Sequence, residues 1–260
     1  MEQLKPNISQ HEKIICPGYT TFTFDDGATS VTIDTTILKS LKGNLHAFAD
    51  AVATSYQIIL QDRWGKSNVD DRLRSGDRSE HAEYLHFLTK HGASVNLTIP
   101  ELEGILGFPS VIKIGAVDKI SLADSFAFHI QTLYNYDSLL DNREKNTFKI
   151  IRPTMLMRFH DSKNEISECI LMPFVEGENA RSIGIPQYLR NTFGYSQSDV
   201  DGYILEQEMT GKYIIGKDNQ EAAYFSDLMK RRGINLGSDV FAKNILVSSQ
   251  NVCTFIDLIP

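Results

Sequence analysis

Three oxygen-bearing side chains lie at defined intervals near the C-terminal end of the sequence. Asp239 precedes Asn244 by five positions, and Asp257 follows Asn244 by thirteen. The apolar runs 245–247 and 252–256 lie between these two residues, separated by a polar turn. Two short strands joined by such a turn form a hairpin, which brings Asn244 and Asp257 to the same end of a sheet. Carboxylate and amide oxygens are the kind of ligand that suits Mg²⁺.

This arrangement resembles the catalytic loop and metal-binding strand of the protein-kinase-like superfamily, which includes the aminoglycoside and choline kinases. Phosphoryl transfer mainly requires that the protein positions the reactants and neutralises the charge of the phosphates. The resemblance implies that Asp239 orients the acceptor hydroxyl and accepts its proton, while Asn244 and Asp257 hold Mg²⁺ against the ATP phosphates. It covers about residues 105–260, and the small bacterial effector kinases are the members that it resembles best.

A second resemblance lies upstream, at a predicted hairpin of two apolar strands. The strands cover residues 155–159 and 169–173, and the polar turn 161–165 joins them. They resemble the two strands that end the kinase N-lobe and run into the hinge, where backbone groups bind adenine. A plain core hairpin is the alternative interpretation. The resemblance assigns nucleotide binding to the hinge residues Met172, Phe174, Val175 and Glu176.

Lys113 is the candidate for the phosphate-binding lysine. It lies between β-branched residues in the predicted strand 110–115, which resembles the N-lobe strand whose lysine contacts the ATP α- and β-phosphates. A solvent-facing strand residue is the alternative. The position of Lys113 before a predicted helix over 120–140, two strands before the hinge, favours the phosphate role. Lys149 is the competing candidate and ranks lower.

The sequence also departs from the kinase pattern. Gly237 stands where the family has His or Tyr, two places before Asp239, and no G-x-G-x-x-G loop precedes Lys113. The predicted helix over 120–140 holds no Glu to pair with Lys113. Three of its side chains would have to substitute: Asp124, Gln131 or Asp137. The sequence stops three residues after Asp257, so the resemblance predicts a reduced C-lobe.

The N-terminal third has a different organisation. Alternating residues at 19–24 and 30–33 flank an Asp-Gly turn, which predicts a β-hairpin. Apolar residues at helical spacing predict one long or two short helices over 35–62. Residues 63–80 combine glycines with many charges and predict a loop or linker. A helix over 80–91 follows.

These patterns together predict an α+β protein with a protein-kinase-like two-lobe fold. Residues 1–92 would form an N-terminal extension, and 93–260 a kinase-like core. Within this core we expect the N-lobe at about 93–175 and a reduced C-lobe at about 176–260.

Composition limits the classes of partner and compartment. The formal net charge of −7 argues against sequence-independent nucleic-acid binding, which needs a basic face. No apolar run approaches the ~20 residues of a membrane span, and no secretory signal begins the sequence. The cysteines are odd in number, far apart and typical of a reducing compartment: Cys16, Cys169 and Cys253. We therefore expect a cytoplasmic protein, or one exported to a host cell without a cleavable signal peptide.

The function that the resemblance implies is ATP- and Mg²⁺-dependent phosphotransfer. We expect an atypical, minimal protein kinase, with a secreted bacterial effector as one form, that has a protein substrate or an activating partner. Three alternatives stay open: a pseudokinase that binds a nucleotide or a partner, a kinase-fold enzyme that transfers AMP, and a globular protein unrelated to kinases. The sequence leaves the oligomeric state open.

Overall fold

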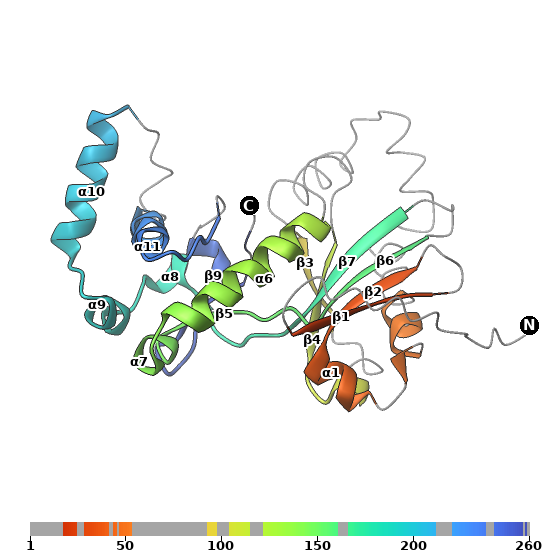
Figure 1. Cartoon of the computed structure of the whole chain (residues 1–260). Helices are drawn as coiled ribbons and strands as arrows, with labels where there is room; N and C mark the ends of the chain where they lie inside the picture. The colour runs from red at the N-terminus through yellow and green to blue at the C-terminus, as the bar shows by residue number, and fades with distance from the viewer. Residues whose placement is uncertain are drawn as a thin grey trace, which may run out of the picture. The chain divides into compact units, whose positions relative to one another are not determined.

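The chain contains two compact units of mixed helix and sheet (Figure 1). This computed structural model describes residues 18–24, 29–41, 44–45, 47–53, 93–97, 104–114, 122–160, 166–211, 220–237, 242–256 and 258. Unit 1 comprises Met1–Phe126 and Pro153–Phe174, and unit 2 comprises Ala127–Arg152 and Val175–Pro260. The predicted α+β class is confirmed.

Unit 1 is built on an antiparallel sheet of six strands. In their order across the sheet, these are β1 (Tyr19–Thr23), β2 (Ser30–Asp34), β6 (Met155–His160), β7 (Ile166–Pro173), β4 (Ser110–Ile114) and β3 (Ala93–Leu97). Both predicted strand pairs are confirmed, β1 with β2 and β6 with β7, although the turns at 25–28 and 161–165 lie outside the described residues. The strands of the predicted N-terminal extension and those of the predicted N-lobe therefore share one sheet.

Helical segments provide the apolar partner for one face of this sheet. Helix α1 (Thr35–Ser40) begins after Asp34, whose Oδ1 accepts a hydrogen bond from the Thr36 amide at 2.7 Å and so satisfies an unpaired donor of the first turn. Residues 47–53 are also helical, which confirms the helical expectation for 35–40 and 47–53, with a turn at Leu41. Residues 42–43, 46 and 54–62, the linker at 63–80 and the helix at 80–91 lie outside the described residues. Buried side chains from the sheet and these segments form the core of unit 1: Val31, Ile33, Leu41, Leu45, Phe48, Ala49, Val52, Ile112, Met155, Met157, Phe159, Cys169 and Leu171.

Helix α6 (Leu122–Leu139) confirms the helix predicted over 120–140. Its first residues belong to unit 1, where Phe126 packs edge-on against Tyr19 with ring centroids 5.3 Å apart. Its remaining turns belong to unit 2 and lead to α7 (Asn142–Lys145). A capping box between Asp141 and Glu144 satisfies amides at the start of α7.

Unit 2 contains a second sheet of four short strands. In order these are β5 (Phe148–Ile150), β10 (Cys253–Phe255), β9 (Ile245–Val247) and β8 (Glu178–Asn179). Strands β9 and β10 form the predicted C-terminal hairpin, and β10 also pairs with β5 in parallel. The helical elements of unit 2 are α8 (Ala180–Ile183), α9 (Gln187–Phe193), α10 (Gln197–Met209), α11 (Gln220–Arg231) and the 3₁₀ turn η2 (Ala242–Asn244).

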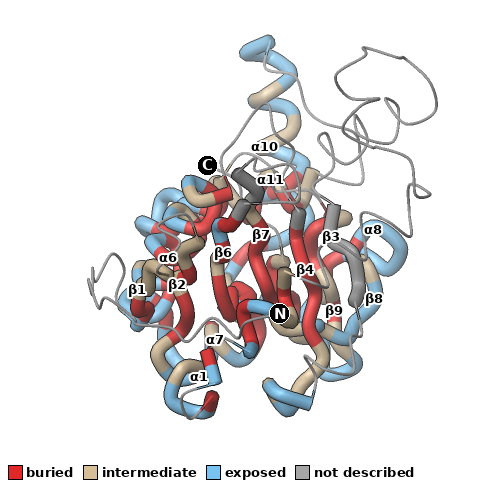
Figure 2. Tube along the Cα trace, turned by 90° about the vertical axis from the view of Figure 1, so that its right-hand side faces the viewer, coloured by how far each residue is buried: buried red, intermediate tan, exposed pale blue. Residues whose placement is uncertain are grey.

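Aromatic rings form the centre of unit 2. Phe148 makes edge-to-face contacts with Phe193, Phe225 and Phe255, with ring centroids 5.1 to 6.0 Å apart. Such pairs stabilise a core beyond the area that they bury. Figure 2 shows the buried residues concentrated on strands such as β6 and β7, whereas α8 and most of α10 are exposed. None of the described helices is both long and apolar enough to cross a membrane.

Candidate functional site

The hairpin of β9 and β10 positions the predicted metal ligands. Asn244 ends η2 immediately before β9 and is buried, with 7% of its surface exposed. Its backbone oxygen accepts a hydrogen bond from the Ile256 amide at 3.0 Å. This contact continues the ladder in which Ile245 faces Phe255. Asn244 therefore lies opposite the residue that directly precedes Asp257.

The turn of this hairpin is fixed by Ser248 and Asn251. The Ser248 amide donates to the Val252 oxygen at 3.0 Å, and Ser248 Oγ accepts from the Gln250 and Val252 amides at 3.3 Å. Asn251 has a φ of 62°, a left-handed conformation that Asn tolerates better than most residues. The polar residues of the turn thus set the register that places Asn244 opposite Ile256.

Asp239 and Asp257 both lie outside the described residues. The described chain approaches Asp239 as far as Gly237. Thr132 Oγ1 of α6 donates to the Asn235 oxygen at 2.9 Å, and Ile234 and Leu236 are fully buried. The segment between α11 and Asp239 is therefore anchored to the part of α6 in unit 2.

Sequence reasoning missed Asn179, which contacts the segment that ends at Asn244. Asn179 Nδ2 donates to the Lys243 oxygen at 2.6 Å, and Asn179 Oδ1 accepts from the Arg181 amide at 3.0 Å. An Asn before a short helical run signals an N-cap, and Asn179 does cap α8. The contact with Lys243 joins residues 64 positions apart and leaves no local signal.

The predicted hinge follows β7. The Phe174 amide donates to the Pro109 oxygen at 2.9 Å, and Met172 is buried in unit 1. Phe174 is 40% exposed, Val175 is half-buried and Glu176 is exposed. The boundary between the two units falls between Phe174 and Val175.

Lys113 lies on β4 and is buried, with 6% of its surface exposed. It pairs with Ile170 of β7, so both side chains are on the sheet face opposite the core residue Ile112. The competing Lys149 lies on β5 and is exposed. The alternative in which Lys113 is a solvent-facing strand residue is therefore wrong.

A carboxylate from the sheet, rather than from α6, lies on the same face as Lys113. Glu168 is two residues before Ile170 and therefore shares its face of β7. Its Oε1 accepts from Arg158 Nε and Nη2 at 2.9 and 2.6 Å, and its Oε2 accepts from the Ala123 amide at the start of α6, at 3.3 Å. The sequence analysis considered only side chains of the predicted helix over 120–140 as partners for Lys113, and therefore did not consider Glu168.

The side chains proposed in place of the missing Glu partner of Lys113 are distributed along α6: Asp124, Gln131 and Asp137. Asp124 is exposed in its first turn. Gln131 donates to Asn135 on the same helix at 3.3 Å, and the Asp137 backbone oxygen accepts from Lys145 Nζ at 2.6 Å. Gln131 and Asp137 both belong to unit 2, whereas Lys113 belongs to unit 1.

The two described cysteines are buried and protonated. Burial raises the pKa of Cys169 to about 12, and the charge of Glu168 adds to this shift. Burial likewise raises the pKa of Cys253 to about 12, with a further contribution from Glu221. Because the thiolate is the nucleophilic and metal-binding form, these residues act as small core side chains rather than as reactive groups. Cys16 lies outside the described residues.

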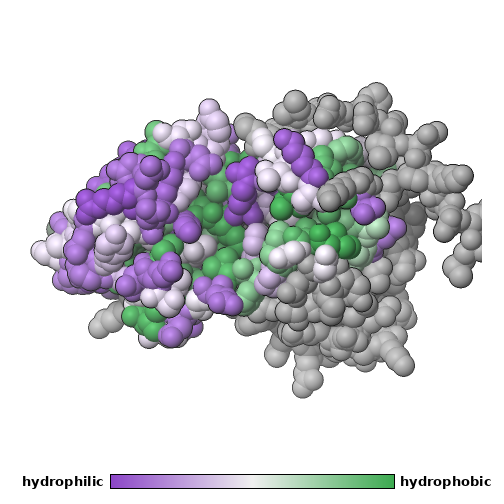
Figure 3. Space-filling view, turned by 90° about the horizontal axis from the view of Figure 1, so that it is seen from below, coloured by the Kyte–Doolittle hydropathy of each residue, from purple (hydrophilic) through white to green (hydrophobic). Residues whose placement is uncertain are grey.

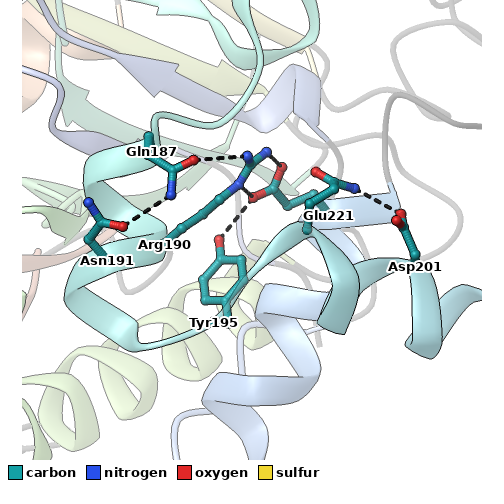
Figure 4. Close-up of polar contacts among 7 residues, drawn as sticks. Gln187, Arg190, Asn191, Tyr195, Asp201 and Glu221 are labelled. Carbon is teal, nitrogen blue, oxygen red and sulfur yellow. Dashed lines mark hydrogen bonds and ion pairs between the residues drawn. The ribbon is translucent and has the colours of Figure 1, made fainter.

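A charged cluster joins α9 to the start of α11 (Figure 4). Arg190 Nε and Nη2 each donate to one oxygen of Glu221 at 2.6 Å, and the Tyr195 hydroxyl donates to Glu221 Oε1 at 3.1 Å. The hydrogen bond to Glu221 raises the pKa of Arg190, while burial and then the charge of Glu221 raise the pKa of Tyr195. The cluster stabilises the packing of α11, the helix that leads toward Asp239.

Within the part of the chain that the structure describes, no three His, Cys, Asp or Glu side chains are grouped to hold a metal ion. The predicted Mg²⁺ ligands are an amide and a carboxylate, and the carboxylate of Asp257 is outside that part. Comparison with protein-family models, with curated proteins and with solved structures gives no match for this chain. A function for the chain therefore has to be inferred from its own residues and contacts.

Proposed function

We propose that this chain is an ATP- and Mg²⁺-dependent phosphotransferase of the protein-kinase-like superfamily, acting on a protein hydroxyl. The observation that carries the proposal is the pairing of Asn244 with Ile256 across the β9–β10 hairpin. Asn244 thus lies opposite the residue that precedes Asp257 in the sequence. In this proposal the side-chain oxygens of Asn244 and Asp257 share a divalent cation.

The donor set of this hairpin end fits Mg²⁺. Asn244 supplies a neutral amide oxygen and Asp257 an anionic one, and hard oxygen ligands of this kind suit the ion. When bound, Mg²⁺ neutralises the charge of the β- and γ-phosphates. Asn244 is buried and ends a 3₁₀ turn, so its backbone is ordered before a ligand arrives.

The remaining roles follow from side-chain chemistry. Asp239 orients the acceptor hydroxyl and takes its proton as general base. In this proposal Lys113, which is buried on β4, supplies positive charge to the α- and β-phosphates. Backbone groups at Met172, Phe174, Val175 and Glu176 bind the adenine ring. In this proposal unit 1 contains most of the strands of the N-lobe, whereas residues 127–152, which the sequence assigned to that lobe, belong to unit 2 with the C-lobe.

The proposal extends to partner and setting. The proposal includes a protein substrate or an activating partner. The face of unit 2 at the left of Figure 3 is mainly hydrophilic, and the whole chain has a net charge of −7. These properties fit a protein that acts in an aqueous compartment, either the cytoplasm or, for a bacterial effector, a host cell.

The test is phosphate transfer from γ-labelled ATP with Mg²⁺, using the full chain with and without eukaryotic lysate. We expect label to appear with the wild type and to be absent with Asp257→Ala, which also loses Mg²⁺-dependent nucleotide binding. Asp239→Ala should retain nucleotide and lose roughly 10²- to 10⁴-fold in rate, the usual contribution of a general base. Asp201→Ala, an exposed acid on α10, is the matched control and should transfer label like the wild type.

Other outcomes identify the alternatives. Transfer from α-labelled but not γ-labelled ATP would indicate AMP transfer. Nucleotide binding without either transfer would indicate a pseudokinase. If the wild type binds no nucleotide with or without Mg²⁺, the kinase-like assignment is wrong and the chain is a globular protein of another kind.

A further inference from the structure

Asn179 joins the start of the helical part of unit 2 to the segment that carries Asn244. We infer that Asn179 is a positioning residue for Asn244, in addition to being the cap of α8. This inference rests on the proposed function, because it assigns Asn179 to the Mg²⁺ site proposed there. It concerns a residue 65 positions before Asn244 in the sequence.

Both ends of the Asn179 amide have a partner. The amide nitrogen donates to the Lys243 oxygen at 2.6 Å, and the amide oxygen accepts from the Arg181 amide at 3.0 Å. An amide that donates at one end and accepts at the other is fixed in orientation, because exchanging its two ends would place like groups together. The half-buried side chain therefore holds the carbonyl that immediately precedes Asn244.

The backbone around Asn179 reinforces this contact. Strand β8 pairs with β9, with Glu178 opposite Val247 and Asn179 opposite Leu246. Gly177 approaches the same strand so closely that an added Cβ would lie 2.9 Å from the Val247 oxygen. The first residues after the predicted hinge are thus packed directly against the strand that follows Asn244.

Asn244 is consequently held from two directions. Asn179 fixes the Lys243 peptide on one side, and the Ile256 amide binds the Asn244 oxygen on the other. The side-chain oxygen of Asn244 is a Mg²⁺ ligand in the proposed site, and its direction depends on both peptides. Groups that orient a metal ligand commonly change metal affinity or activity by about 10- to 100-fold when they are removed.

Substitution can separate the two roles of Asn179. Asn179→Asp keeps an oxygen for the Arg181 amide, and Asp caps a helix about as well as Asn. It removes the donor to the Lys243 oxygen and sets a carboxylate against that carbonyl. Asn179→Ser also keeps a capping oxygen and cannot donate through an amide, so it is a second variant of the same design. Asn191→Asp, on α9, is the matched control because Asn191 uses only its oxygen, as acceptor from Gln187.

The experiment is a Mg²⁺ titration of the initial transfer rate with γ-labelled ATP, together with urea unfolding of each full-length variant. We expect the Mg²⁺ concentration for half-maximal rate to rise at least about tenfold in Asn179→Asp and Asn179→Ser. The unfolding midpoint should stay near that of the wild type, and Asn191→Asp should be unchanged in both measurements. If Asn179 acts only as a helix cap, which both variants preserve, neither the midpoint nor the Mg²⁺ requirement should change.

Two negative outcomes are distinguishable. In the first, the wild type transfers phosphate and the folded Asn179 variants need no more Mg²⁺ than the wild type. This result overturns the positioning role and leaves the proposed function intact. A wild type whose nucleotide binding does not respond to Mg²⁺ overturns the proposed site and the positioning role together.

Discussion

Gly177 allows the chain after β7 to pass close to β9. A Cβ built at this position would lie 2.9 Å from the Val247 oxygen and 3.2 Å from the Leu246 Cβ. Both neighbours belong to a strand that is paired on each side, so neither can move without breaking ladder hydrogen bonds. At this residue, the absence of a side chain is a steric requirement for pairing β8 with β9.

We therefore predict that Gly177→Ala lowers the free energy of unfolding by about 1–3 kcal/mol, the usual cost of overpacking. Urea unfolding followed by circular dichroism measures this change. Gly202→Ala is the control, since Gly202 is exposed within α10 and an added Cβ there has no neighbour within 4 Å. Replacing a helical glycine should stabilise the protein by about 0.5–1 kcal/mol. A neutral Gly177→Ala would show that β9 shifts at little cost.

Helix α11 depends on a charged contact as well as on apolar packing. Arg190 of α9 and Glu221 of α11 form a two-point ion pair, and their side chains are only 20% and 16% exposed. Bidentate geometry and low exposure distinguish this pair from a typical surface salt bridge. Phe225 and Met229 of the same helix are fully buried, so the pair and the apolar face act together to hold α11.

We predict that Arg190→Gln and Glu221→Gln are each destabilising, by about 1–3 kcal/mol, because each leaves a partner with an unsatisfied half-buried charge. The double variant should lose less than the sum of the single losses, and a double-mutant cycle by thermal or urea unfolding measures this coupling. Strict additivity would show that the pair contributes nothing specific. Gln197→Ala removes an exposed contact with Asp201 and should change stability by less than about 0.5 kcal/mol.

Most elements could be predicted from the sequence because their signals are local. Alternation around a turn identified β1 with β2, apolar runs around a polar turn identified β9 with β10, and helical spacing identified α1. The pairing of β5 with β10 joins residues about a hundred positions apart, and a three-residue strand such as Phe148–Ile150 has too little pattern to name its neighbour. Local rules therefore predicted the elements, and the contacts between distant elements had to come from the structure.

For the candidate site too, the sequence predicted local features, whereas contacts between distant residues came from the structure. The spacing of Asn244 and Asp257 predicted a hairpin that brings their backbones together, and Asn244 does lie opposite Ile256. The side chain that supports this arrangement was not predictable, because Asn179 acts on a partner remote in sequence. The burial of Lys113 could not be predicted from the sequence either, since a lone lysine between β-branched residues occurs in both buried and exposed strands.

The acid–base behaviour of the whole protein follows from its buried weak acids. Burial raises the pKa of Cys169 and of Cys253 to about 12, and burial together with a hydrogen bond to Asp227 raises the pKa of Tyr203 to about 12. Burial also raises the pKa of Tyr136 and Tyr195. All five shifts have the same sign, so the folded state retains protons at alkaline pH that the unfolded chain releases.

This difference determines how stability changes with pH. The unfolded chain loses its thiol protons near pH 8.5 and its tyrosine protons near pH 10, whereas the folded state keeps them until higher pH. Above about pH 8.5 the folded state therefore binds more protons, and the free energy of unfolding must fall as the pH rises. A fully buried group such as Cys169 contributes a slope that approaches about 1.4 kcal/mol per pH unit, and more exposed groups such as Tyr203 contribute less. Urea unfolding from pH 7 to pH 10.5 measures this fall.

The two thiols provide the internal comparison for this prediction. The double variant Cys169→Ala/Cys253→Ala lacks both thiols and keeps its tyrosines. Its free energy of unfolding should stay nearly constant up to about pH 9.5 and decline only as tyrosine ionises in the unfolded chain. The wild type should begin to decline about one pH unit earlier. If both proteins show the same profile, the thiols ionise alike in the folded and unfolded states, which would mean that water reaches Cys169 and Cys253 in the native protein.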